Sequence, residues 1–333
     1  MPSVGEFAGL EARTMTETVR RFPPPKFAGE KLFEGPQPSI TSKVYWDIVE
    51  GTRKLGKFST VGAEAHVRAL EPRKRVHTEL LYVREKKVID EATKNFIERV
   101  GEFDEPYGQQ LLNDELEALN RVIENTKEWA RWQAIVRGQL DVRQSDPPVY
   151  VKIDYGYKSS HKPTLTGTNK WSDTSNSKPL SNLLTWKRLI SRDSWLTPAR
   201  AYCSSQVMQY LVENSNIQTL IQYTVGNQLA QNGYLTVLAG LDITVYDVSY
   251  VDDDGNVQQF VPDDKFVVVA REAIGKEITG PQDVPTDNGV KTMIGKISYS
   301  WVTKDPVDTW ILVGDSFIPA IQQPDGIVSA TIA

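Results

Sequence analysis

Residues 106–137 predict a single long amphipathic helix, and this helix constrains the fold of the chain more than any other stretch. Apolar side chains recur along it at helical spacing, and Pro106 and Gly138 suit its first turn and its stop. The apolar row consists of Leu112, Leu116, Leu119, Ile123, Ala130 and Ala134. At about 1.5 Å per residue the helix would reach roughly 48 Å, longer than the usual helix of a compact domain. We therefore predict a central helix that packs one broad face against a hydrophobic core.

The charges along this helix agree with its predicted direction. Acidic residues gather in its first half and basic residues in its second half, which matches the helix dipole. Glu117 and Arg121, and Glu128 and Arg131, are spaced to pair on adjacent turns, and each such pair contributes only about 0.2–0.5 kcal/mol. Burial of the apolar face, rather than ion pairing, is therefore expected to stabilise the helix.

Composition limits the class of protein. The chain has 333 residues with a formal net charge of -5, enough for two domains with real cores and unsuited to nucleic-acid binding along its whole length. It has one cysteine, Cys203, which excludes an intrachain disulfide, and we interpret the surrounding segment as a buried helix. The sequence contains neither a secretion signal nor an apolar run of about 18 residues. These features favour synthesis in the cytosol.

Two segments precede the helix. Residues 1–40 are interrupted by prolines and glycines and predict an extended arm, with a disordered terminus as the alternative. Residues 45–88 contain strand-like pieces separated by short turns, which predicts a long hairpin rich in basic residues. These cations either form a solvated face or contact an acidic neighbouring subunit. The candidate interface residues are Arg53, Lys57, Arg68, Arg73, Lys74, Arg75 and Arg84.

The remainder of the chain mixes both kinds of secondary structure. A strand is predicted at 149–157, followed by a long polar loop at 162–178. Helices are predicted at 182–190, 198–214 and 217–229, the second because Thr197 and Pro198 resemble a cap and first turn. Later strands are predicted at 234–239, 241–251, 257–261, 266–270, 295–303, 309–313, 317–321 and 327–332. The fold class is therefore α+β.

Catalytic motifs are scarce. The chain has three histidines, none of them in a zinc-binding or nucleophile-elbow motif, and it has no glycine-rich phosphate loop. The acidic turn from Asp252 to Asn256 does not fit a calcium loop, because aligning Gly255 places Tyr250 at the first ligand position. The tryptophans at helical spacing are more typical of a core than of a stacking platform. We predict no catalytic residues, no metal ligands and no cofactor.

Three stretches resemble a known family. The first is ITVYDVSYVDDDGNVQQFVPDDKFVVVA, which has a tyrosine-bearing strand, a polar turn, and Phe260 and Pro262 ahead of a buried strand. The second is LTGTNKWSDTSNSKPLSNLL, with Gly167, Trp171 and Ser172 ahead of a helix entry, and the third is the final IVSATIA. In this order, after an arm, a basic hairpin and a long helix, they resemble the major capsid proteins of tailed bacteriophages of the lambda type, the coat protein E family.

The resemblance implies an HK97-like capsid fold with an N-terminal arm, an extended β-hairpin loop, a spine helix, and peripheral and axial domains. It places the arm at 1–45, the loop at 46–90, the peripheral domain at 91–184 and 298–333 with spine helix 106–137, and the axial domain at 185–297. Such a protein would be a non-enzymatic coat subunit whose pentamers and hexamers form an icosahedral shell around double-stranded DNA.

The resemblance also implies partners and a location. Portal and scaffold proteins are expected, with a decoration protein as a further candidate, and the enclosed DNA would not be bound specifically. Some relatives carry a long, cleaved N-terminal scaffolding region, whereas about forty residues precede the hairpin here, so a separate scaffold protein is expected. The protein would be made and assembled in the host cytoplasm, would end in the virion and would not involve a membrane.

Two other interpretations remain open. A cargo-holding compartment shell of the encapsulin type has the same fold and would be separated from a virus by its neighbouring genes. An enzyme acting on nucleic acid or sugars would use the tryptophans and acidic turns, but the sequence offers no acid, base and nucleophile set for it.

Overall fold

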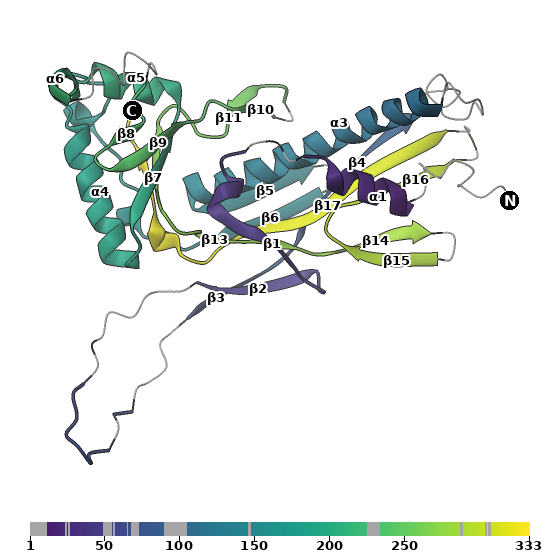
Figure 1. Ribbon diagram of the computed structural model, residues 1–333, viewed down its shortest axis with the longest axis horizontal. Coiled ribbons are helices and arrows are strands. Elements are labelled where there is room, and N and C mark those ends of the chain that lie inside the picture. Colours follow the sequence, from purple (N-terminus) through teal and green to yellow (C-terminus); the bar gives the residue numbers. More distant parts are fainter. Residues whose placement is uncertain are drawn as a thin grey trace. The chain divides into compact units, whose positions relative to one another are not determined.

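The computed structural model describes residues 12–23, 25, 27–48, 55, 57–64, 66–67, 73–89, 105–145, 148–224, 234–252, 254–286, 289–303, 305 and 308–333. The chain divides into two compact units (Figure 1). The first unit comprises residues 1–44, 78–132 and 276–320, and the second comprises 45–77, 133–275 and 321–333.

In the first unit, helices pack on a sheet whose neighbouring strands are not consecutive in the sequence. Its helices are α1 (Ala12–Arg21), η2 (Glu30–Leu32) and α3 (Glu105–Trp132). Its strands are β1 (Phe33–Pro38), β4 (Leu81–Ile89), β13 (Gly275–Thr279), β14 (Pro281–Thr286), β15 (Gly289–Ile294), β16 (Ile297–Val302) and β17 (Thr309–Ile321). The sheet order is β1-β13-β17-β16, β4 also pairs with β17, and β14 and β15 form a separate hairpin. β17 therefore holds the sheet together.

The predicted central helix is confirmed. It is formed by α3, which continues as the π-helical η3 (Gln133–Arg137), and Gly138 follows with a positive φ of 64°. The described members of its apolar row are buried, and Leu112, Leu116, Leu119 and Ile123 pack with Ile311 and Val313 of β17. The spacing of apolar residues thus identified the core-facing side of the helix.

The arm differs from its prediction. Residues 12–21 were expected to be extended, but they form α1, which buries Met15 and Val19 in the same core as α3. The Thr16 hydroxyl donates to the Ser298 carbonyl at 2.8 Å and accepts from the Ser298 amide at 3.0 Å. No proline or glycine lies between Gly9 and Pro23, so these ten residues are free to form a helix.

The second unit is built on a five-stranded sheet in the order β18-β12-β7-β9-β8. These strands are β7 (Pro198–Cys203), β8 (Val237–Leu238), β9 (Leu241–Val245), β12 (Lys265–Ala270) and β18 (Ile327–Thr331). Its helices are α4 (Pro179–Ser194), α5 (Ser205–Glu213), α6 (Ser215–Thr224), η4 (Ser159–His161), η5 (Gly167–Asn169) and η6 (Pro324–Gly326). Two-stranded pairs are formed by β2 (Lys43–Ile48) with β3 (Lys74–Glu79), β5 (Gln139–Ser145) with β6 (Pro148–Asp154), and β10 (Ser249–Val251) with β11 (Val257–Gln259).

An aromatic cluster lies in the core of the second unit. Trp171 contacts Trp186 and Phe266 with ring centroids 5.7 and 5.0 Å apart, and all three side chains are buried. The prediction that tryptophans anchor the core is therefore confirmed for these two. Trp195 is different, because it is 65% exposed.

The helix predicted at 198–214 is wrong over residues 198–203. Residues 198–203 form β7, a central strand between β9 and β12, and α5 starts only at Ser205 with Ser204 as its cap. Cys203 accordingly ends a buried strand rather than lying in a helix. Pairing on both edges outweighs the local cap signal at Thr197 and Pro198. Of the helix predicted at 217–229, residues 225–229 lie outside the described residues.

Candidate interaction surface

The basic hairpin is anchored at its base within the second unit. The Trp46 indole donates to the Ile321 carbonyl at 3.1 Å, and its ring lies 6.2 Å from that of Tyr155. Across the two strands, the Arg75 Nε lies 2.9 Å from the Asp47 carboxylate and an Arg73 nitrogen lies 3.8 Å from it. The hydrogen bond from Arg75 lowers the pKa of Asp47. The base of the hairpin is therefore fixed by internal contacts.

The seven predicted interface cations fall into separate environments. Arg73 and Arg75 pair with Asp47 of their own hairpin, whereas Lys74 and Lys57 are exposed. Arg84 belongs to the first unit, where its Nε lies 3.2 Å from the Gln282 side-chain oxygen. Arg53 and Arg68 lie outside the described residues.

Apolar side chains of the loop between β2 and β3 form a feature that sequence reasoning missed. Leu55, Phe58, Val61 and Val67 are 90%, 105%, 108% and 85% exposed, respectively. Large apolar residues exposed together mark a binding surface more often than a solvated loop. The sequence did contain a signal for this surface: the apolar residues are isolated in a basic, glycine-containing stretch that cannot build a core of its own.

A buried charge network crosses the first unit beneath α3. The Lys127 ammonium lies 2.7 Å from Glu277 and 3.1 Å from Asp315, and Arg131 lies 2.5 Å from Glu277 and 3.2 Å from Glu128. These five side chains are at most 8% exposed. Glu128 also accepts from the Gly29 amide and the Trp132 indole. Lys127 and Arg131 thus join α3 to β13 and β17.

Burial and the neighbouring cations shift the pKa values of the carboxyl groups in this network. Burial alone favours neutral Glu277, but the cations of Lys127 and Arg131 outweigh it and lower the pKa of Glu277. For Asp315 burial prevails, and its pKa is raised. Because each carboxylate is paired with a cation inside the core, the network is suited to fixing α3 in place rather than to acid-base chemistry on a substrate.

The buried histidine is likewise held by the fold. His161 is fully buried, with Nδ1 2.8 Å from the Ile327 carbonyl and Nε2 3.2 Å from Asp193. Although burial disfavours the charged carboxylate, hydrogen bonds from Arg192 and His161 lower the pKa of Asp193 to about 2. This group therefore links η4, α4 and β18 within the second unit.

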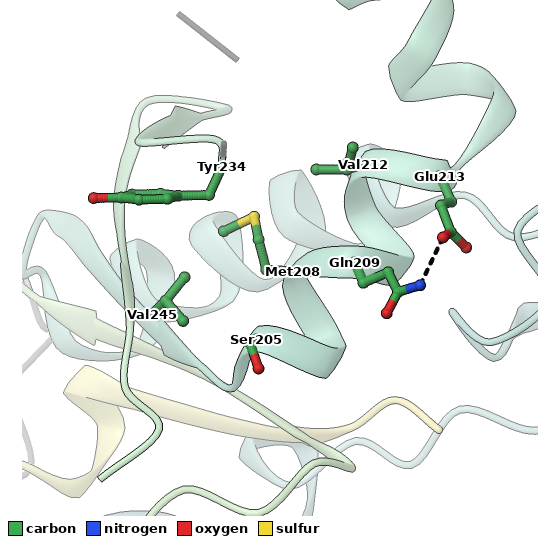
Figure 2. A pocket seen from close by; sticks show the side chains of 7 residues that line it. All are labelled: Ser205, Met208, Gln209, Val212, Glu213, Tyr234 and Val245. Atoms are coloured by element: carbon green, nitrogen blue, oxygen red, sulfur yellow. Dashed lines mark hydrogen bonds between the residues drawn. The ribbon is translucent and has the colours of Figure 1, made fainter. Parts of the chain in front are cut away.

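A pocket of about 310 Å³ lies beside α5. Figure 2 shows the side chains that line it. Its lining residues are Ser205, Met208, Gln209, Val212, Glu213, Tyr234 and Val245. Gln209 donates to Glu213 at the rim, and the lining offers Ser205 no histidine or lysine as a base. The described residues contain no group of three or more metal-ligating side chains, and none of their helices is long and apolar enough to span a bilayer.

Comparison with known proteins gives a consistent result. The sequence model of the family described as phage major capsid protein E matches residues 11–332. A prophage protein of E. coli CFT073, provisionally assigned as a capsid protein, has a TM-score of 0.66 at 16% identity, covering 97% of this chain and 99% of its own. A phage-related protein of Bordetella bronchiseptica RB50 has a TM-score of 0.59 at 12% identity, covering 97% and 98% of the two chains.

The capsid structure of Cyanophage P-SCSP1u is also similar, with a TM-score of 0.52 at 10% identity and coverage of 93% and 89%. These likenesses confirm the HK97-like capsid fold that the sequence resemblance implied.

Proposed function

The chain belongs to the phage major capsid protein E family, and from that premise we propose that its copies assemble, as pentamers and hexamers, into an icosahedral shell that encloses double-stranded DNA. The family assignment favours a phage coat protein over a compartment shell. We propose that the chain acts structurally and not as an enzyme. The division into arm, extended loop, peripheral domain and axial domain is part of the same proposal.

The observation that carries the proposal is the loop between β2 and β3. Its base is fixed by Trp46 and Asp47, while Phe58 and Val61 are fully exposed in the single chain. Exposing these side chains in a finished particle would forfeit about 1.5–3 kcal/mol for each. A second copy of the chain that covers them would recover this free energy at every repeated contact.

We propose that the loop of one copy lies on the unit of the next copy that contains α3. The outer side of α3 carries Asp114, which is exposed. The loop presents the exposed cation Lys57 beside Phe58. Opposite charges at the rim would orient the contact, and the apolar residues would supply most of its free energy. Arg73 and Arg75 are assigned to holding the hairpin rather than to the contact, because Asp47 already binds them.

Two serine substitutions test this contact. The double variant Phe58→Ser, Val61→Ser should leave the circular dichroism of the chain unchanged and should abolish shells in negative-stain electron microscopy. Val290→Ser on β15 is the matched control, since Val290 is 74% exposed but lies outside the loop, and it should assemble normally. Normal shells from the double variant would refute the role of the loop.

The partners follow from the same proposal. Portal and scaffold proteins would act with the shell, a decoration protein is a further candidate, and the DNA would be enclosed without specific binding. The net charge of -5 agrees with a wall that does not hold phosphates. Assembly would take place in the host cytoplasm, and the finished protein would reside in the virion. Co-expression with a candidate scaffold, followed by electron microscopy of the products, tests these assignments.

A further inference from the structure

The outer side of α4 carries a strip of exposed residues whose chemistry suits a protein partner. Leu184 is 49% exposed, Trp195 is 65% exposed, and Arg188 and Arg192 lie between them at helical spacing. We call these four residues the α4 strip. The opposite side of the helix buries Leu183, Trp186 and Ile190 in the core. Tryptophan and arginine are the residue types most enriched among the dominant contacts of protein interfaces.

Trp195 holds an unusual backbone position. It caps the C-terminus of α4 with φ 62° and ψ 9°, in the left-handed region that glycine adopts without strain. A bulky residue is rare there, and residues held in such conformations gather at functional sites. An exposed indole at a position better suited to glycine indicates that this side chain has a use outside the folded chain.

A second exposed surface of the same unit has complementary properties. Val251 and Val257 pair directly across the β10–β11 hairpin and are 66% and 71% exposed. Tyr250 points to the other face, where it contacts Phe260 with ring centroids 5.1 Å apart. Asp252 and Asp254 follow Val251 in the turn, and hydrogen bonds from the turn backbone lower the pKa of Asp252. We call Val251, Val257, Asp252 and Asp254 the β10–β11 patch.

The α4 strip and the β10–β11 patch of one chain cannot contact each other. Figure 1 shows α4 and the β10–β11 hairpin on opposite sides of the second unit. One surface carries two arginines and a tryptophan, and the other carries two aspartates and two valines. A contact between different surfaces of identical chains is head to tail, and such a contact generates a closed ring when the rotation from one copy to the next closes on itself.

On this basis, and resting on the proposed function, we propose that the α4 strip of one copy docks on the β10–β11 patch of the next copy within a ring of subunits. Arg188 faces Asp252 and Asp254, Arg192 adds positive charge beside it while its Nε stays 3.0 Å from Asp193 of its own chain, and Trp195 covers the valine pair. This contact is separate from that of the extended loop, so removing one leaves the other's residues in place.

Charge reversal with rescue tests the pairing in the full chain. Arg188→Glu alone and Asp254→Arg alone should each lower the yield of rings and shells at least tenfold. The double variant should recover to within about twofold of the unmodified chain. Lys178→Glu, at the exposed start of the same helix, is the matched control and should assemble normally. Single variants that assemble normally, or a double variant no better than the worse single one, would overturn the proposal.

The Trp195→Gly variant tests the contact in a second way, because its stability and its assembly should change in opposite directions. Glycine relieves the left-handed backbone, so the melting temperature should stay the same or rise while assembly falls. A stable variant that assembles as well as the unmodified chain would remove Trp195 from the contact.

Cross-linking separates failure of this contact from failure of the proposed function. If the unmodified chain forms no shells, the Arg188→Cys, Asp254→Cys variant is oxidised and run on a non-reducing gel. Burial, with a smaller effect of Asp247, raises the pKa of Cys203 to about 12, which keeps that thiol out of the exchange. A ladder of linked oligomers, absent from a Lys178→Cys, Asp254→Cys control, supports the contact. Monomers alone would refute it.

Discussion

Replacing Lys127 by methionine should be among the most damaging single substitutions in the first unit. The Lys127 side chain is 8% exposed and lies within 3.1 Å of both Glu277 and Asp315. Methionine keeps much of the packing but removes the cation, so two buried carboxylates lose their shared partner. Breaking a buried pair in this way costs about 3–5 kcal/mol. With a urea m-value of about 3 kcal/mol/M, the unfolding midpoint should fall by about 1 to 1.7 M.

The loss of stability caused by Lys127→Met should also depend on pH. Burial already raises the pKa of Asp315, so the folded state holds its proton more tightly than the unfolded state. Loss of the Lys127 ammonium raises that pKa further. A raised carboxyl pKa makes stability fall as pH increases, since the folded state then binds more protons than the unfolded state. The destabilisation by Lys127→Met should therefore be larger at pH 8 than at pH 5.

Urea unfolding with hydrogen exchange of α3 peptides measures this effect. Lys87→Met is the matched control, because the Lys87 and Glu115 side chains are 52% and 35% exposed and their pair should be worth about 0–1 kcal/mol. Adding Asp315→Asn to Lys127→Met should restore part of the loss, because less uncompensated charge stays buried. An effect of Lys127→Met no larger than that of Lys87→Met would refute the reasoning.

Three further substitutions test other parts of the fold by the same unfolding assay. Leu119→Ala should cost about 2–5 kcal/mol by removing core packing, and an unchanged midpoint would show that the apolar row is not buried. Gly280→Ala should cost about 1–3 kcal/mol, because a Cβ there would lie 1.9 Å from the Leu80 Cδ1; a neutral result would mean that the leucine moves freely. Ser204→Ala removes the cap that accepts from the Val207 amide and should cost about 1 kcal/mol, with faster exchange in the first turn of α5; unchanged exchange would contradict the cap.

Long, regular patterns made part of the fold predictable. The α3 helix and the strands β12 and β18 carry continuous or periodic apolar sequence, and the structure buries those residues. Val122 shows the limit of the method: it is an apolar residue of the same helix, yet it is 45% exposed because it lies outside the row that packs on the core.

Strands without a clear local pattern could not be predicted. The strands β13, β14 and β15 were missed, and β15 is almost wholly exposed, so its sequence lacks the alternation that identifies a half-buried strand. The segment 198–203 was assigned to a helix because its strand character depends on β9 and β12, which lie far along the chain.

For the candidate interface, the sequence indicated the hairpin but not the contacts within it. Basic composition drew attention to the hairpin, but the sequence could not show that Asp47 binds Arg73 and Arg75. The Glu128 and Arg131 pair was predicted as a weak contact within the helix, yet it is buried, and Glu277 approaches Arg131 from a strand distant in sequence. The predicted pair of Glu117 and Arg121 is formed at 2.8 Å.

The buried network beneath α3 also determines how that helix can move. A slide by one turn, about 5.4 Å, would separate Lys127 from Glu277 and Asp315 and Arg131 from Glu277, while the Arg131 pair with Glu128 would move with the helix. At intermediate positions some charges would be buried and unpaired, so these positions have a high free energy and form a barrier to sliding. The helix therefore has one axial register on its sheet. Forces applied to the first unit during assembly would displace α3, β13 and β17 together, as a single rigid part.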